Sequence, residues 1–208
     1  MENTSEKLQI VLATSNPGKI AELQSMLTEL PIEWIPQSEF NIPDIEETGK
    51  TFIENAILKA RHAAKLSGLP ALADDSGLVI DALDGAPGIY SARYAGKDAT
   101  AEERNQKVLD EMKAVPKEER TAAYHCVMAL VEYEDDPVPL ICHGIWEGSI
   151  LSEPCGTNGF GYDPIFYVTT HDCSAAELSN AEKNAISHRG QVVDQLLEVF
   201  HSLIEHKH

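Results

Sequence analysis

The stretch 12-LATSNPGKIAELQSML-27 joins the end of an apolar run to the start of a helical pattern through a short polar turn. Residues 8–13 have the composition of a buried strand, and residues 19–30 carry apolar side chains at helical spacing. Asn, Pro and Gly are ordinary turn formers, so one interpretation of residues 14–19 is a plain connection. The other is an anion-binding loop, because a helix N-terminus presents unpaired N–H groups and the positive end of a dipole.

The turn does not match the phosphate-binding loop of Walker-type ATPases. Gly18-Lys19 lacks the upstream glycine that this motif requires, and Ile20 stands where the motif has Ser or Thr. A P-loop ATPase is therefore disfavoured, whereas anion binding by the turn is not.

The rest of the chain has a mixed α/β pattern. Thr51 and Glu54 form a capping box for a helix that Gly68 and Pro70 end. The other predicted elements are strands at 71–73, 78–83, 122–133, 140–151 and 165–168, and helices at 100–114, from 174 and from 183 onward. The 208 residues show no linker and no repeat, so residues 1–208 are expected to form a single domain.

The chain is strongly acidic, with 34 Asp and Glu residues against 16 Lys and Arg residues and a net charge of −18. Nucleic acids and anionic membranes bind basic patches, so neither is an expected partner. No apolar run approaches the roughly 20 residues of a membrane span, and the first residues lack a signal-peptide pattern, so we expect a cytoplasmic protein. The four cysteines form no zinc-binding pattern and are expected to be reduced.

Two acidic pairs are candidates for a metal site. Asp74-Asp75 lies in 74-DDSG-77, between two predicted strands, where a solvated turn is the ordinary interpretation. Two adjacent carboxylates also suit Mg²⁺, which takes one or two carboxylates and shares its other positions with water and phosphate oxygens. Glu46-Glu47 by itself is typical surface charge, but together with the aspartates it would complete such a site.

The loop 159-GFGYDP-164 places two aromatic residues among glycines. A hydrophobic plug beneath a long loop is the ordinary explanation. The alternative is a nucleobase stacked on Phe160, since stacking on an aromatic side chain is worth about 1–3 kcal/mol per base.

In combination and in order, these segments resemble the inosine triphosphate pyrophosphatase family, enzymes that hydrolyse deaminated purine nucleoside triphosphates. The resemblance covers almost the whole chain. It rests on 14-TSNPGK-19, 46-EETGKTFIENAILKAR-61, 74-DDSG-77, 85-GAPGIYSARYAG-96, 159-GFGYDP-164 and 183-KNAISHRG-190.

The resemblance implies the fold, the assembly and the reaction. The fold would be an elongated mixed β-sheet flanked by helices, in two lobes with a central nucleotide cleft, and the assembly a homodimer. With Mg²⁺ as cofactor, the enzyme would hydrolyse dITP, ITP and XTP to the monophosphate and pyrophosphate, which removes them from the nucleotide pool.

The resemblance also implies the roles of individual residues. Asp75 would be the general base and a Mg²⁺ ligand, Glu46 the second acidic ligand, and Ser76 a substrate contact. The triphosphate would be bound by Thr14, Ser15, Asn16, Pro17, Gly18 and Lys19. The base would be held by Phe160, Gly161, Tyr162 and Asp163, with Lys183, His188 and Arg189 closing over it.

Two rival functions remain at this stage. A metal-dependent phosphomonoesterase would use Asp74 or Asp75 as nucleophile, but the segment lacks the D-x-D arrangement of such enzymes. A non-catalytic nucleotide sensor would have no need of two carboxylate pairs.

Overall fold

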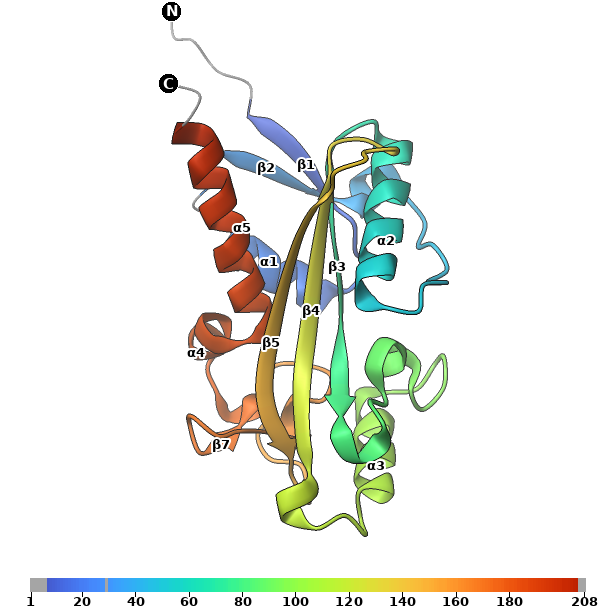
Figure 1. Cartoon of the computed structure of the whole chain (residues 1–208), viewed down its shortest axis with the longest axis vertical. Helices are drawn as coiled ribbons and strands as arrows, with labels where there is room; N and C mark the ends of the chain where they lie inside the picture. Colours follow the sequence, from blue (N-terminus) through green and yellow to red (C-terminus); the bar gives the residue numbers. More distant parts are fainter. Residues whose placement is uncertain (1–6, 29, 206–208) are drawn as a thin grey trace, which may run out of the picture. The chain divides into compact units, whose positions relative to one another are not determined.

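The computed structural model describes residues 7–28 and 30–205, with side chains described up to residue 202. Within this range the strands form a seven-stranded sheet in the order β2-β1-β3-β4-β5-β6-β7 (Figure 1). The strands are β1 (Leu8–Leu12), β2 (Ile32–Pro36), β3 (Ala71–Ile80), β4 (Thr121–Val131), β5 (Leu140–Ile150), β6 (Phe166–Val168) and β7 (Cys173–Ser174). The α-helices are α1 (Pro17–Met26), α2 (Phe52–Ser67), α3 (Ala101–Glu111), α4 (Asn180–Ile186) and α5 (His188–Glu205). Short 3₁₀ helices are η1 (Gln37–Phe40), η2 (Asp81–Leu83), η3 (Gly88–Arg93), η4 (Lys117–Glu119), η5 (Asp163–Ile165) and η6 (Ala175–Glu177).

The sheet is mixed, as predicted. β1 runs parallel to both β2 and β3, whereas β6 is antiparallel to β5 and to β7. β2 is a strand that the sequence interpretation missed. None of the described helices combines the length and the apolar character needed to cross a membrane.

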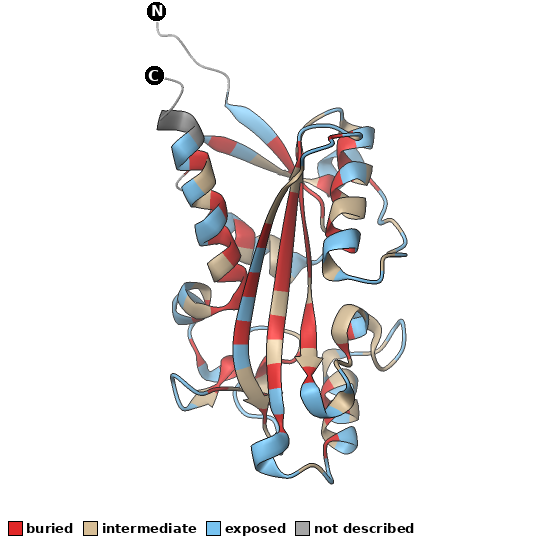
Figure 2. Cartoon of the chain, in the orientation of Figure 1, coloured by how far each residue is buried: buried red, intermediate tan, exposed pale blue. Residues whose placement is uncertain are grey.

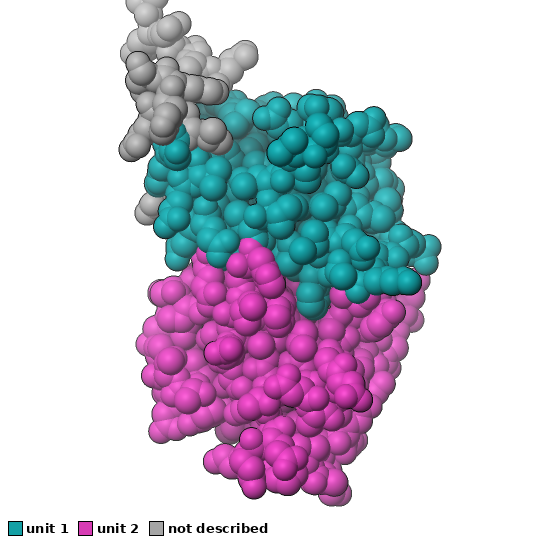
Figure 3. Space-filling model, in the orientation of Figure 1, with its two compact units in different colours: residues 1–75, 127–142, 192–208 teal, residues 76–126, 143–191 magenta. Residues whose placement is uncertain are grey.

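The chain divides into two compact units (Figure 3). Unit 1 contains residues 1–75, 127–142 and 192–208, and unit 2 contains residues 76–126 and 143–191. β3, β4 and β5 each contribute residues to both units. The prediction of one two-lobed domain with a central cleft concerns the arrangement of these units, and it stays a prediction.

The two units have hydrophobic cores of different character. In unit 1, one face of α2 is buried (Figure 2), and the alanines on it pack against apolar residues of the sheet. These buried alanines are Ala56, Ala60, Ala63 and Ala64. Small side chains let the helix backbone lie close to the strands. The core of unit 2 combines aliphatic side chains with buried aromatic rings, which belong to Tyr124, Trp146, Tyr162 and Phe166.

The predicted signals at the ends of α2 are present. Thr51 Oγ1 accepts a hydrogen bond from the Glu54 N–H at 3.2 Å and caps the helix. The return contact of the capping box is shifted, because Glu54 Oε2 accepts from the Lys50 N–H at 2.7 Å. At the other end Gly68 has φ +72, a left-handed conformation that glycine adopts without steric cost.

The prediction of a turn at 74-DDSG-77 is wrong, because β3 runs without interruption from Ala71 to Ile80. Both Asp74 and Asp75 are buried, and the strand is buried along nearly its whole length (Figure 2). Carboxylates are normally exposed to solvent, but these two have lysine partners, which makes burial within a strand tolerable.

The prediction that Lys183 opens the last helix is also wrong. Lys183 lies in the separate short helix α4, and α5 begins only at His188. Ser187 divides the two helices with an extended backbone, and its Oγ accepts a hydrogen bond from the Gly190 N–H at 3.2 Å. The sequence carried the signal for this break, since 179-SNAE-182 is a capping box that starts α4.

Candidate active site

The turn before α1 is held in shape by its own asparagine. Asn16 Oδ1 accepts hydrogen bonds from the N–H groups of Gly18 at 2.9 Å and Lys19 at 3.2 Å, and Pro17 is the first helical residue. Asparagine at the N-cap and proline at the first position are both favoured at helix starts. The cap occupies two N–H groups that a bare helix end would offer to an anion. Among the groups of the turn, the ammonium of Lys19 is therefore the one best suited to meet an anion.

The two residues before the cap are also held by hydrogen bonds. Thr14 Oγ1 accepts from the Asn16 N–H at 3.2 Å, and Ser15 Oγ donates to Asp44 Oδ2 at 2.7 Å. Gln37 Nε2 donates to the other oxygen of Asp44 at 2.8 Å. The predicted loop is thus a pre-ordered structure in which hydroxyl groups and backbone are already oriented.

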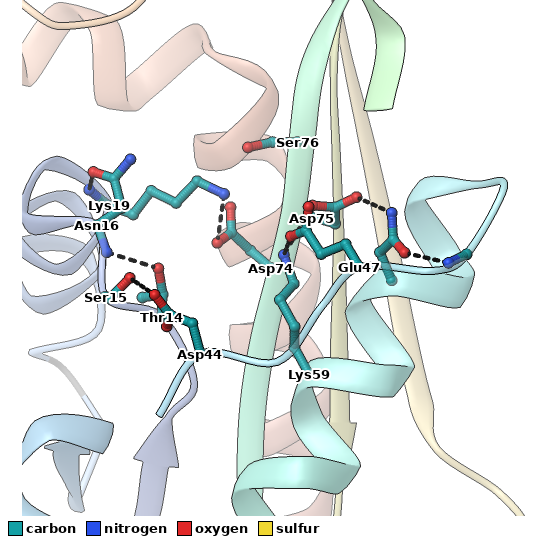
Figure 4. A network of polar contacts seen from close by, with 12 residues as sticks. Thr14, Ser15, Asn16, Lys19, Asp44, Glu47, Lys59, Asp74, Asp75 and Ser76 are labelled. Carbon is teal, nitrogen blue, oxygen red and sulfur yellow. Dashed lines mark hydrogen bonds and ion pairs between the residues drawn. The ribbon is translucent and has the colours of Figure 1, made fainter. Parts of the chain in front are cut away.

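The turn is linked to β3 by an ion pair. Lys19 Nζ lies 3.0 Å from Asp74 Oδ1, and the side chains are 14% and 0% exposed (Figure 4). A predicted phosphate ligand and the first of the two adjacent aspartates are therefore neighbours in unit 1.

Asp75 is paired with a different lysine. Lys59 Nζ, from α2, lies 2.8 Å from Asp75 Oδ1 and 2.8 Å from Glu47 Oε1 (Figure 4). Asn55, one turn earlier on α2, donates to Asp75 Oδ2 at 3.3 Å. We call Lys19, Glu47, Asn55, Lys59, Asp74 and Asp75 the acid–lysine cluster. All of its members belong to unit 1.

The residues of this cluster shift one another's pKa values. Burial raises the pKa of the Asp75 carboxyl above its ordinary value, and the positive charge of Lys59 opposes this rise. Burial by itself would lower the pKa of Lys59, but the negative charges of Asp75, Asp74 and Glu47 outweigh it and raise the pKa. A carboxylate with a raised pKa, fixed on a strand, is suited to accept a proton near neutral pH.

The acidic residues fit Mg²⁺ in the chemistry of their donor atoms. Asp75 and Glu47 each direct one oxygen to the same cationic group, the Lys59 ammonium. Oxygen ligands are what Mg²⁺ prefers, and one or two carboxylates suffice for it. Glu46, the predicted second ligand, is exposed, and its neighbour Glu47 is the residue that shares Lys59 with Asp75. In the described part of the chain, no three His, Cys, Asp or Glu side chains are grouped to hold an ion, so water or phosphate would complete its coordination.

The second group of predicted residues centres on Asp163 in unit 2. Asp163 Oδ2 accepts from Lys183 Nζ at 2.6 Å and from the Phe160 N–H at 2.8 Å, while Tyr124 OH donates to Oδ1 at 3.2 Å. A side chain at Gly159 would place its Cβ 2.1 Å from Asp163 Oδ2, so the carboxylate needs glycine there. Asp163 thereby fixes the position of the Phe160 loop.

Two cations approach the ring of Phe160. Lys183 Nζ lies 4.6 Å and Arg189 Cζ 5.8 Å from the ring centroid. Arg189 also donates to Ser76 Oγ at 3.1 Å. A base stacked on this ring would share it with these cations or displace them.

His188 is held by aromatic stacking. Its ring is stacked on Tyr124, with centroids 4.7 Å apart and planes at 6°, and Trp146 follows at 6.1 Å and 17°. Burial, and next the charge of Asp163, raise the pKa of Tyr124 well above its ordinary value, so the phenol stays protonated and donates to Asp163. We call Tyr124, Phe160, Asp163, Lys183, His188 and Arg189 the Asp163 cluster.

Sequence reasoning and structure differ in detail at the two clusters. Tyr162 was expected to hold the base, but its side chain is 3% exposed in the core and donates to the Ser91 carbonyl at 2.8 Å. Lys59 has no assigned role in the sequence analysis, although its position one turn after Asn55 places both on one face of α2. Tyr124 was not singled out, because the strand pattern does not show whether a tyrosine only fills the core or also contacts residues of the candidate site.

Comparison with known proteins identifies several relatives that match nearly the whole chain. The family model described as the Ham1 family matches residues 10–199. A protein of Coxiella burnetii named dITP/XTP pyrophosphatase is 64% identical over 192 residues, which cover 92% of this chain and 96% of that protein. A protein of Escherichia coli (strain K12) with the same name is 56% identical over 190 residues, covering 91% of this chain and 96% of its own length.

Solved structures agree with these matches. The structure of a HAM1 protein from Coxiella burnetii has a TM-score of 0.89 and 63% identity, and the match covers 94% of this chain and 99% of that one. The Ham1 protein of Staphylococcus aureus has a TM-score of 0.83 and 39% identity, with 93% and 98% covered.

Proposed function

The chain belongs to the Ham1 family, as its resemblance to inosine triphosphate pyrophosphatases predicted, and we propose that it hydrolyses dITP, ITP and XTP to the monophosphate and pyrophosphate. The observation that carries this proposal is Asp75, a buried carboxylate on a rigid strand, held by Lys59 and Asn55. The relatives bear the name of this activity, and the acid–lysine cluster supplies the groups that it needs.

Within the acid–lysine cluster, we assign proton transfer to Asp75 and phosphate binding to Lys19. The raised pKa of Asp75 suits it to take a proton from the water that attacks the α-phosphorus. Lys59 lies 2.8 Å from the carboxylate, and its positive charge opposes this rise and favours the ionised form of Asp75. In the proposed complex, the Lys19 ammonium exchanges its ion pair with Asp74 for contact with the phosphates.

Mg²⁺ is the proposed cofactor, with Asp75 and either Glu46 or Glu47 as its carboxylate ligands. When bound, it neutralises negative charge on the pyrophosphate leaving group. A chain with a net charge of −18 repels a polyanionic substrate, which makes such neutralisation more important.

The Asp163 cluster is proposed to bind the base. Hypoxanthine and xanthine carry a 6-keto acceptor where adenine has an amino donor. Arg189, buried and 5.8 Å from the Phe160 ring, and His188 supply N–H donors for that oxygen. Adenine presents an amino donor there and cannot accept from these groups, a mismatch that can give about 10⁴–10⁵ in discrimination.

Ser76 is adjacent in sequence to the acid–lysine cluster and contacts a residue of the Asp163 cluster. It follows Asp75 directly in β3, and its hydroxyl accepts from Arg189. β3 therefore carries Asp74 and Asp75 of the acid–lysine cluster and also the hydroxyl that contacts Arg189. Residence in the cytoplasm, expected from the sequence, and assembly as a homodimer, which the family resemblance implies, remain part of the proposal.

The test is turnover of ITP followed as inorganic phosphate by malachite green, with and without added pyrophosphatase. The proposal expects phosphate only when pyrophosphatase is added, and no turnover by Asp75→Asn, because an amide cannot accept the proton. Asp84→Asn is the matched control, since Asp84 is an exposed residue at φ 51, where asparagine is well tolerated. Phosphate released without pyrophosphatase would indicate a phosphomonoesterase, and no turnover of any nucleotide would indicate a sensor.

A further inference from the structure

Two histidines outside both clusters face each other on neighbouring strands of unit 2. His125 lies on β4 and His143 on β5. His125 Nδ1 and His143 Nε2 are 3.1 Å apart, and the rings stack with centroids 5.4 Å apart and planes at 29°. Neither residue is used by the proposed reaction.

The separation of these nitrogen atoms matches the bite of a metal chelate. Zn–N bonds are about 2.0–2.1 Å long, so two nitrogen ligands on one ion lie about 2.9 Å apart at a right angle and about 3.4 Å apart at the tetrahedral angle. The observed 3.1 Å falls between these limits. The backbone positions of the two strands therefore already hold the imidazoles at a distance suitable for one ion.

The pair is also accessible, and burial favours the neutral form of one of its imidazoles. His143 is exposed and His125 is half-buried. Burial, and then the neighbouring His143, lower the pKa of His125, which keeps this imidazole neutral at neutral pH. In the hydrogen-bonded pair one facing nitrogen carries a proton. To bind an ion, the imidazole that carries this proton changes to its other tautomer. The proton then lies on the nitrogen that faces away from the ion, and no proton is released.

We propose that His125 and His143 bind one transition-metal ion of the Zn²⁺, Ni²⁺ or Cu²⁺ class and thereby cross-link β4 to β5. Imidazole nitrogen suits these ions, whereas the carboxylates of the acid–lysine cluster suit Mg²⁺, so the two kinds of site are chemically distinct. Since the described residues include no group of three potential ligands, water occupies the remaining positions.

Such an ion has a structural consequence for the Asp163 cluster. His125 follows Tyr124 in β4, and Tyr124 stacks under His188. A cross-link at His125 restrains the strand that carries this ring. The ion would thus stiffen the support of a proposed base-binding residue without contacting it.

The test is calorimetric titration of the untagged full chain with Zn²⁺, in the presence of excess Mg²⁺ to occupy the oxygen-ligand sites. The chain has eight histidines, two of them at positions 206 and 208, so all variants carry His206→Gln and His208→Gln. We expect one Zn²⁺ per chain. Loss of a second-shell partner alone costs about 10–100-fold in metal affinity, so His143→Gln should cost at least about tenfold.

Three variants decide between one shared ion and separate histidines. If both imidazoles bind the same ion, His125→Gln and the double variant should lose about as much affinity as His143→Gln. His171→Gln, an exposed histidine elsewhere in unit 2, should leave the affinity unchanged. Unchanged Zn²⁺ affinity in His143→Gln, or losses that add in the double variant, would overturn the proposal. His143 is exposed, so its variant is expected to fold even where the His125 variant does not.

Discussion

Replacing Asp163 by asparagine removes one charge from the most buried ion pair among those described. Lys183 Nζ and Asp163 Oδ2 are 2.6 Å apart, and the side chains are 5% and 2% exposed. The amide keeps the size of the carboxylate but not its charge. Asparagine also has one accepting oxygen fewer: if the amide oxygen faces Lys183 and the Phe160 N–H, the NH₂ group faces the Tyr124 hydroxyl, and one contact of the carboxylate must change.

The expected cost follows from burial. Two unit charges 2.6 Å apart attract by about 6 kcal/mol at an effective dielectric constant of about 20, which sets an upper limit. Breaking a buried pair by removing one partner typically costs about 3–5 kcal/mol, because the other charge stays buried without compensation. This loss is a large fraction of the total free energy of unfolding, which is typically about 5–15 kcal/mol.

Urea unfolding measured by tryptophan fluorescence tests this value. The chain has two tryptophans, and in a Trp34→Phe background only Trp146 reports, from the core of unit 2. Glu134→Gln is the matched control, because the Lys65–Glu134 pair is 58% and 43% exposed and should contribute about 0–1 kcal/mol. Adding Lys183→Met to Asp163→Asn should recover part of the loss, since the uncompensated charge disappears.

A loss below about 1 kcal/mol in Asp163→Asn, similar to that of the exposed control, would refute the reasoning. So would a double variant that is less stable than Asp163→Asn alone, because Lys183 would then be stabilising without its partner.

Three further outcomes are expected. Lys19→Ala should raise KM and lower kcat together, and it should weaken binding of the triphosphate more than of the monophosphate; equal effects would place Lys19 away from the phosphates. In urea unfolding, Gly190→Ala should be more destabilising than Gly68→Ala. A Cβ at Gly190 would lie 1.8 Å from a backbone oxygen of α4, whereas at Gly68 nothing lies within 4 Å and alanine meets only the cost of the left-handed backbone, about 1–2 kcal/mol; equal losses would mean that α4 shifts without cost. A hydrogen bond from the Lys50 N–H, and then one from a neighbouring hydroxyl, lower the pKa of Glu54, so the stability that this carboxylate contributes is present above its unfolded pKa of about 4.3 and is lost as pH falls through the folded value. The difference in urea midpoint between the unmodified chain and Glu54→Gln should therefore shrink between about pH 6 and pH 3, and a constant difference would contradict the capping role.

Helix starts and motif positions could be predicted from the sequence because they depend on residues that are close together in the chain. Asn16 and Pro17 announce α1, and Thr51 with Gly68 delimits α2, since a cap and the N–H groups it satisfies are only a few residues apart. The order of the motifs was enough to indicate the family for the same reason: each motif is a short run whose residue types are visible without any knowledge of the fold.

Burial and charge pairing were decided by the tertiary structure. Asp74 and Asp75 look like turn residues, and they lie inside a buried strand only because Lys19 and Lys59 arrive from two other elements. These partners are 55 and 16 positions away in the chain, and local propensity carries no information about them. Which aromatic side chain of 159-GFGYDP-164 enters the core is likewise a matter of packing, since Tyr162 and Phe160 are similar in type and only the shape of the surrounding core separates them.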